Sequence, residues 1–196
     1  HLLLGTSYEE NLDDGTKKSF SFKYIDFENI ENNHFFVTEE FIVDRANQNE
    51  ITKTRRPDLV VFVNGIPLVV IELKKSSVNY ENGIKQLEKE QKKDEIPHLF
   101  KYIQLTIAAN SNEARYGTMG TPLKFYSLWK EEESQKAKET LKTIIDNREV
   151  TSLDLTLFAL LSKDRLLRLI KHYILFDKKV KKVSRYQQFF GIEKTL

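Results

Sequence analysis

The chain has 196 residues, of which 40% are hydrophobic and 31% charged, a composition typical of a globular protein large enough to bury a core. It has no cysteine, which excludes structural disulfides and thiolate metal sites, and no apolar run is long enough to span a membrane. The net charge of +2 is lower than expected of a domain that grips DNA by charge alone. No signal peptide is visible, so we expect a cytoplasmic protein, and the start at His1 without Met suggests a fragment.

The first half of the chain is predicted to be rich in strands. Ser19–Ile25 and Phe35–Val43 alternate as strands do, and two apolar runs on either side of Asn64-Gly65 predict a hairpin over Leu59–Lys74. Helical spacing follows from about Tyr80 to Lys93. After Pro97 interrupts the helix, an apolar strand is expected over residues 102–109. This order indicates an α/β protein with a mixed central sheet flanked by helices.

The second half is predicted to be mainly helical. Thr121–Trp129 has the pattern of one more strand, and the charged segment Glu131–Glu149 that of a helix. A further helix is indicated by Ser162 as its N-cap, with apolar residues at helical intervals behind it. These helices are expected to cover the sheet or to form a small cap.

The composition changes beyond Phe176, where a short basic segment, Asp177–Lys182, begins. Such segments link domains or contact phosphate. We therefore expect one domain over residues 1–176 and a linker over residues 177–196.

Charged residues at the ends of the two apolar hairpin strands need an explanation. Asp58 precedes the first strand, and Glu72 and Lys74 end the second. Successive strand residues point to opposite faces, so Glu72 and Lys74 share a face, whereas Leu73 turns away and offers only its backbone carbonyl. Two carboxylates can hold a divalent ion, and an ammonium beside them can position an attacking water. The alternative is a turn residue at Asp58 and a solvated strand end at Glu72–Lys75.

Strand pairing tests this interpretation. A regular two-residue loop at Asn64-Gly65 would pair Asp58 with Ile71 and leave Glu72 on the opposite face from Asp58. Both acids can reach one ion only if the hairpin has a three-residue loop or a bulge, and bulges are common beside active sites. We therefore predict a bulge or longer loop near residues 64–67.

Eight short motifs occur in one order over most of the chain: Tyr24-Ile25-Asp26-Phe27-Glu28-Asn29, Asn33-His34-Phe35-Phe36-Val37, Arg56-Pro57-Asp58, Asn64-Gly65-Ile66-Pro67-Leu68, Glu72-Leu73-Lys74, Ile96-Pro97-His98-Leu99-Phe100, Ala114-Arg115-Tyr116-Gly117-Thr118 and Arg185-Tyr186-Gln187-Gln188. Together they resemble the PD-(D/E)xK nucleases, and in detail the amino-terminal domain of the R (restriction and motor) subunit of type I restriction enzymes. The resemblance implies a restriction-endonuclease-like core in which Asp58 and Glu72 bind Mg²⁺ and Lys74 assists the attack.

The same resemblance bears on the helix after the hairpin. The family usually carries a Gln-x-x-x-Tyr motif there, and this chain supplies Gln86 but has Glu90 at the tyrosine position. Gln86 is a candidate DNA contact, with a solvated helix residue as the alternative. Arg55 and Arg56, just before Asp58, are candidate contacts to the DNA backbone.

Two further expectations concern the ends of the chain. In the family a helix precedes the first core strand and often contributes an acid, so Glu9 and Glu10 are candidates. Near the other end, the family's adenine-reading glutamine of the ATP site corresponds to Gln188, or else Gln188 ends a polar linker. No Gly-Lys-Ser/Thr phosphate loop occurs here, so the segment could not hold ATP tightly alone.

The resemblance thus implies a Mg²⁺-dependent endonuclease domain acting on double-stranded DNA. In the family, cleavage depends on ATP-driven translocation and on specificity and methyltransferase subunits. Two alternatives remain: a docking or DNA-binding module of the motor with weak chemistry of its own, and a standalone nuclease of the same superfamily. The four histidines are not at zinc-ligand spacing, and we assign them structural roles.

Overall fold

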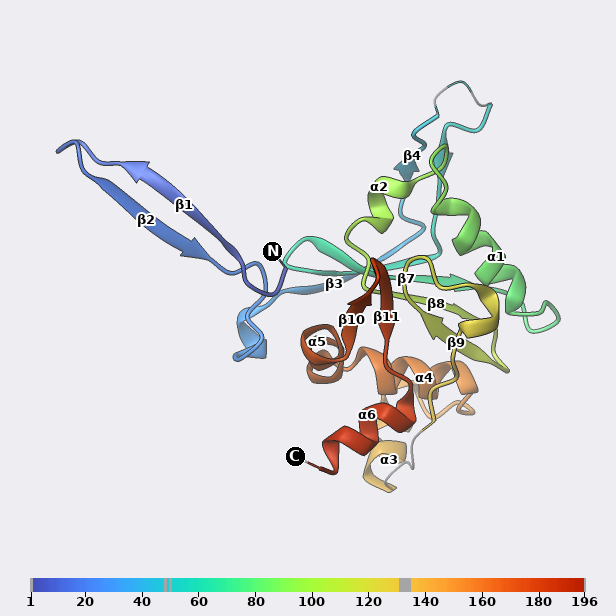
Figure 1. Ribbon diagram of the computed structural model, residues 1–196. Helices are drawn as coiled ribbons and strands as arrows, with labels where there is room; N and C mark the ends of the chain where they lie inside the picture. The colour runs from blue at the N-terminus through green and yellow to red at the C-terminus, as the bar shows by residue number, and fades with distance from the viewer. Residues whose placement is uncertain (1, 48, 50, 131–134, 196) are drawn as a thin grey trace.

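A computed structural model describes residues 2–47, 49, 51–130 and 135–195. Its centre is a five-stranded sheet of order β3-β6-β7-β8-β9 (Figure 1). Only β7 and β8 are parallel, so the sheet is mixed, as predicted. Its strands are β3 (Phe35–Glu39), β6 (Leu59–Val63), β7 (Ile66–Leu73), β8 (Leu105–Ala109) and β9 (Ala114–Gly117).

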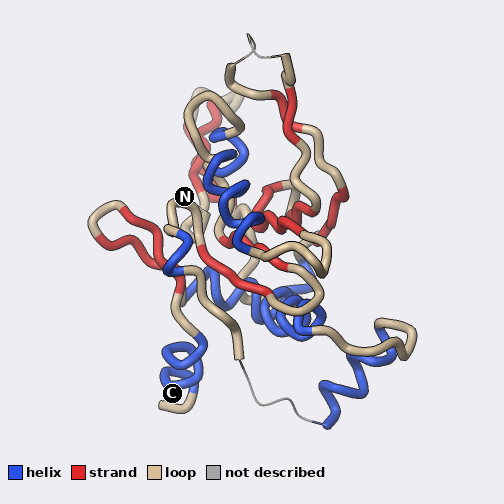
Figure 2. Tube along the Cα trace, turned by 90° about the vertical axis from the view of Figure 1, so that its right-hand side faces the viewer, coloured by secondary structure: helices blue, strands red, loops and turns tan. Residues whose placement is uncertain are grey.

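Helices cover both faces of the sheet (Figures 1 and 2). The connection from β7 to β8 contains α1 (Glu81–Glu90) and α2 (Pro97–Phe100), which lie on one face. The opposite face is covered by α4 (Ser152–Leu161), α5 (Lys163–His172) and α6 (Tyr186–Glu193). This arrangement confirms the expected α/β core.

The two faces follow from side-chain alternation along the central strands. Val60 and Val70 point toward α1 and pack with Ile84 and Leu87. Their strand neighbours point the other way, into a cluster with the helices of the opposite face; this cluster includes Val61, Val69, Ile71, Leu166, Ile170 and Phe189. Both β6 and β7 are therefore buried on two sides, which explains their continuous apolar runs.

The β6–β7 hairpin has a two-residue turn and a bulge. Asn64 and Gly65 have φ angles of 51° and 80°, as a tight hairpin turn requires, so the turn itself is regular. The register then shifts, because Phe62 pairs with Pro67 whereas Val61 pairs with Val69, leaving Leu68 as the extra residue. The predicted bulge is confirmed, one residue beyond the segment where we expected it.

Before the core, the expected leading helix is absent from the described residues. β1 (Thr6–Asn11) and β2 (Lys17–Phe22) form instead an antiparallel hairpin that projects from the body (Figure 1). Glu9 and Glu10 lie on this projecting hairpin, so the structure does not bring them to Asp58 and Glu72. The prediction was wrong because a turn with Gly15 at a φ of 80° pairs residues 6–11 with residues 17–22 as a hairpin.

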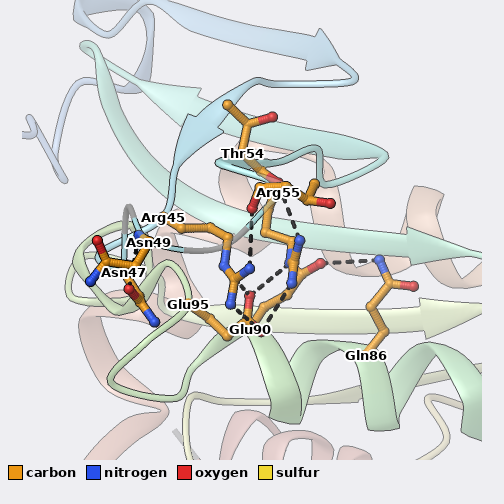
Figure 3. Close-up of polar contacts among 9 residues, drawn as sticks. Arg45, Asn47, Asn49, Thr54, Arg55, Gln86, Glu90 and Glu95 are labelled. Carbon is orange, nitrogen blue, oxygen red and sulfur yellow. Dashed lines mark hydrogen bonds and ion pairs between the residues drawn. The ribbon is translucent and has the colours of Figure 1, made fainter.

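The expected strand Phe35–Val43 is divided. β3 ends at Glu39, and Glu40 adopts a positive φ of 46° that breaks the extended run. β4 (Val43–Asp44) then pairs with β5 (Thr54–Arg55) in a separate two-stranded arm. This arm places Arg55 beside the end of α1 (Figure 3).

In the second half, one predicted strand is wrong, one predicted helix is found with shorter bounds, and one helix was not predicted. Thr121–Trp129 contains a short 3-10 helix, Leu123–Phe125, and a single bridge to β9 instead of a strand. The expected helix Glu131–Glu149 is α3 (Gln135–Ile144), and residues 131–134 lie outside the described part. Helix α4 was not predicted, because its apolar residues are spread around the helix and form no stripe along one face.

The C-terminal segment is part of the packed body. β10 (Ile174–Asp177) pairs with β11 (Val180–Val183), so the expected boundary at residue 176 falls within a hairpin. In α6, Phe189 is 2% exposed and packs edge-on against Trp129. Burial of this aromatic side chain holds α6 against the body of the protein, although the polar composition of the segment had suggested a linker. None of the described helices is both long and apolar enough to cross a bilayer.

Candidate active site

Asp58 and Glu72 lie opposite each other at the end of the β6–β7 hairpin. Leu59 pairs with Ile71, and continuing this register places Asp58 opposite Glu72 on the α1 face. Asp58 is held by a hydrogen bond of 2.6 Å from the backbone N–H of Leu73 to its Oδ2. The bulge at Leu68 has therefore brought together the two acids that a regular hairpin would have separated.

Lys74 contacts Glu72 directly. Its Nζ lies 2.6 Å from Glu72 Oε1 and donates a second hydrogen bond of 2.9 Å to Oε1 of Gln86 on α1. Leu73 packs against the core of the opposite face, as alternation predicts. The structure thus brings together four of the predicted site residues, Asp58, Glu72, Lys74 and Gln86.

Close approach of α1 is made possible by a glycine. A Cβ atom on Gly83 would lie 3.2 Å from the Cβ of Ala108 and 3.4 Å from Cγ of Glu72. Any larger side chain would push the helix off the sheet at this point. Glu72 is therefore enclosed between β7 and α1, with only 1% of its surface exposed.

Burial dominates the electrostatics of Glu72. Its pKa is raised to about 7, chiefly by desolvation; the negative charges of Asp58 and Glu90 contribute to this rise, and the hydrogen bond and charge of Lys74 oppose it. Glu72 Oε2 is buried and has no hydrogen-bond partner in the described part of the protein. A buried carboxylate oxygen without a partner is expected where a cation binds.

The donor set fits a hard cation such as Mg²⁺, which prefers carboxylate, carbonyl and water oxygens. Asp58, Glu72 and the Leu73 carbonyl are the predicted ligands. Among the described residues, no three His, Cys, Asp or Glu side chains are grouped so that they could hold a metal ion. A cation here would thus rest on two carboxylates and complete its shell with the carbonyl and water.

The two predicted DNA-contact arginines have different environments. Arg55 is mostly buried, and its Nε lies 2.7 Å from Oε2 of Glu95. Arg56 has 58% of its side chain exposed and pairs at 3.2 Å with the equally exposed Glu40. Arg56 can exchange its surface partner for a phosphate at little cost, whereas Arg55 would have to leave a buried ion pair.

Glu90, at the family's tyrosine position, is buried beside the site, which the sequence did not indicate. It faces the site from the last turn of α1, is 2% exposed, and accepts a hydrogen bond of 3.1 Å from Nε2 of Gln86. Desolvation raises its pKa, against the lowering effects of Gln86 and Arg55. The spacing of four residues from Gln86 was a signal for a shared helix face, but burial could not be read from it.

Gln188 lies elsewhere. It lines a cavity of about 890 Å³ together with residues of β9, β11 and α6. Its Oε1 accepts a hydrogen bond of 2.9 Å from the backbone N–H of Arg185. Because α6 covers the sheet face opposite α1, the structure does not bring Gln188 together with Asp58 and Glu72.

A mixed sheet with two opposed acids and a lysine at the end of a bulged hairpin, covered by one helix, is characteristic of proteins with a restriction-endonuclease-like fold. Comparison with known families then narrows the class. Residues 2–125 match the family "Type I restriction enzyme R protein N terminus", and the chain belongs to that family.

Curated relatives agree with this assignment. The chain is 33% identical, over 96% of its length, to the putative type I restriction enzyme MjaIXP endonuclease subunit of Methanocaldococcus jannaschii. It is 29% identical, over 95% of its length, to the type I restriction enzyme HindI endonuclease subunit of Haemophilus influenzae. The chain spans only 18% and 17% of the lengths of these two relatives.

Proposed function

We propose that this chain carries the Mg²⁺-dependent DNA-cleavage site of a type I restriction enzyme R subunit. One observation carries the proposal: the Leu68 bulge sets Asp58 opposite Glu72, with Lys74 in contact with Glu72. A structural role alone does not require a buried acid and a lysine at the end of two otherwise apolar strands. Membership in the R-protein family supports the same conclusion.

Asp58 and Glu72 would hold the ion, together with the carbonyl of Leu73. When bound, Mg²⁺ supplies a Lewis acid that stabilises charge on the phosphate and lowers the pKa of a water molecule. The unpartnered Oε2 of Glu72 is the atom that such a cation would satisfy. The hydrogen bond from Leu73 N–H fixes the Asp58 carboxylate before any ligand arrives, so little rearrangement is needed.

Lys74 would act on the attacking water and on the phosphate. Its ammonium is anchored by Glu72 and Gln86, which leaves its third N–H to donate to a water or a phosphate oxygen. A fixed positive charge at this position stabilises the negative charge that develops in the transition state. Gln86 can contact the DNA backbone from the same helix face, and Arg56 is the more accessible of the two candidate arginines.

The complete subunit would cleave double-stranded DNA within a restriction-modification complex. We infer that specificity and methyltransferase subunits select the DNA and that ATP drives translocation, with Gln188 contributing to adenine recognition in the longer protein. The family assignment and the names of the relatives support the setting of a type I restriction enzyme. The roles of ATP, of the partner subunits and of Gln188 follow from the sequence resemblance alone.

Replacement of Lys74 by Ala in the complete complex tests the proposal. We expect cleavage to fall by about 100-fold or more while ATP hydrolysis is retained, since the ammonium acts only in the nuclease site. Lys75 is the matched control, because it is the adjacent residue, carries the same charge and is exposed. Lys75→Ala should cleave at the wild-type rate. Unchanged cleavage by Lys74→Ala would rule out the proposed site.

A further inference from the structure

Glu90 is a buried acid that the proposed chemistry does not use. Its Oε1 accepts the hydrogen bond from Gln86, and its Oε2 has no hydrogen-bond partner among the residues that the structure describes. A buried carboxylate is destabilising unless nearby groups favour its charge. The family implies a tyrosine at this position, so the presence of an acid requires an explanation from this chain itself.

Positive charge near Glu90 comes from the β4–β5 arm. Arg45 and Arg55 both bind Glu95, which follows α1: Nε of Arg45 lies 3.2 Å, and Nε of Arg55 2.7 Å, from Glu95 Oε2 (Figure 3). Desolvation disfavours the charge of Glu90, and the negative charges of Glu95 and Asp58 repel it, whereas the positive charge of Arg55 attracts it and partly offsets these effects.

The arm is itself firmly placed. Nη1 of Arg45 donates to the Thr52 carbonyl at 3.1 Å, and the backbone N–H of Ala46 donates to the Glu95 carbonyl at 2.7 Å. Side chains of Arg45 and Glu95 are each no more than 5% exposed. The charges that face Glu90 are therefore fixed by the fold rather than carried on mobile surface side chains.

The negative charge of Glu90 affects the position of Lys74 through the side-chain amide of Gln86, which contacts both residues. An ionised carboxylate can only accept hydrogen bonds, so Glu90 requires the NH₂ group of Gln86 to face it. The amide oxygen must then point the other way, where it accepts from Lys74 Nζ at 2.9 Å. A tyrosine hydroxyl both donates and accepts, so it would not impose this orientation.

We propose that Glu90 is a positioning residue that fixes the Gln86 amide and thereby holds the Lys74 ammonium over Glu72, with Arg55 and Glu95 supporting it. This inference rests on the proposed function, because it assigns Glu90 a role only through Lys74. It also assigns Arg55 to the support of the site rather than to the DNA backbone.

The test uses the full-length subunit in its complex. Glu90→Met keeps the length of the side chain but removes the acceptor, whereas Glu90→Gln keeps an oxygen that can accept from Gln86. We expect Glu90→Met to lower the cleavage rate at saturating DNA by about 10-fold or more, with the same KM for DNA and the same ATPase rate. Glu90→Gln keeps an accepting oxygen but, like tyrosine, also carries a donor and so does not impose the Gln86 orientation, and it should restore only part of the cleavage. Glu81→Gln, at the other end of α1, controls for loss of an acid from this helix.

A double-mutant cycle separates positioning from a general effect on stability. If Glu90 acts through Gln86, combining Glu90→Met with Gln86→Met should lower cleavage no further than Gln86→Met alone. Losses that multiply would overturn the proposal, as would wild-type cleavage by Glu90→Met. Should Glu90→Met not fold, Gln86→Met must show the loss by itself, and full activity of that variant also overturns the proposal. In each case loss of cleavage by Lys74→Ala shows that the proposed function still holds, whereas its full activity shows that the function itself fails.

Discussion

Glu72→Gln should stabilise the metal-free protein at neutral and alkaline pH. The folded-state pKa of about 7 lies above the ordinary value of 4.5, so between these values the folded protein binds more protons than the unfolded chain. Stability is therefore lost as the pH rises from about 4.5 to 7. The difference corresponds to at most about 3 kcal/mol, and we expect about 1–2 kcal/mol after solvent screening. Glutamine keeps the oxygen that accepts from Lys74 but has no charge to desolvate.

Urea unfolding of the 196-residue chain in EDTA, at pH values from 5 to 8, measures this effect. The free energy of unfolding of the wild type should fall relative to that of Glu72→Gln across this range. Mg²⁺ should then stabilise the wild type at pH 8 but not Glu72→Gln, because the ion binds the folded carboxylate. Glu39→Gln, an exposed acid of β3, is the control for charge removal. A Glu72→Gln variant that is no more stable than the wild type at pH 8 would refute the reasoning.

Two other positions give stability predictions. Asn64 has a positive φ, and its Oδ1 accepts a hydrogen bond of 2.8 Å from the backbone N–H of His34. Asn64→Ala should therefore lower the free energy of unfolding by about 2 kcal/mol, and Asn64→Gly by less. Equal losses of the two variants in chemical denaturation would contradict a role for the left-handed turn. Asp154 caps α4 and binds both terminal nitrogens of Arg148, which holds its pKa well below the usual range. Since this stabilisation is present above the unfolded pKa of about 3.9 and is lost as the pH falls, Asp154→Asn should cost about 1 kcal/mol at pH 7 and progressively less in acid. A loss that does not depend on pH would show that the charge is not responsible.

The central hairpin was predictable because two strong local signals agreed. Asn64-Gly65 specified the turn, and continuous β-branched runs specified strands buried on both faces. The need for both acids to share a face then required a bulge, although no local signal placed it at Leu68. A bulge depends on how both strands pack, so its position is decided by the whole core.

Elements that depend on tertiary packing were not predictable in the same way. The apolar residues of helix α4 are spread around its circumference and form no periodic stripe, and Phe189 appeared in a segment whose composition resembled a linker. Arg55 looked like a surface charge because its partner, Glu95, lies 40 residues further along the chain. The burial of Glu90 likewise depends on the β4–β5 arm, which sequence periodicity could not place over α1.

The position of the bulge explains how one strand can serve both core and site. Leu68, the extra residue, lies close to the hairpin turn and before Val69, so the side chains of β7 alternate regularly between the two faces from Val69 onward. Val69 and Ile71 fill the core beneath one face and Val70 fills the other, which leaves Glu72 to continue on the face of Val70, under α1. A bulge after Ile71 would instead have turned Val69, Val70 and Ile71 to the faces opposite those they occupy. The irregularity is therefore placed where it can align Glu72 with Asp58 without disturbing either apolar core.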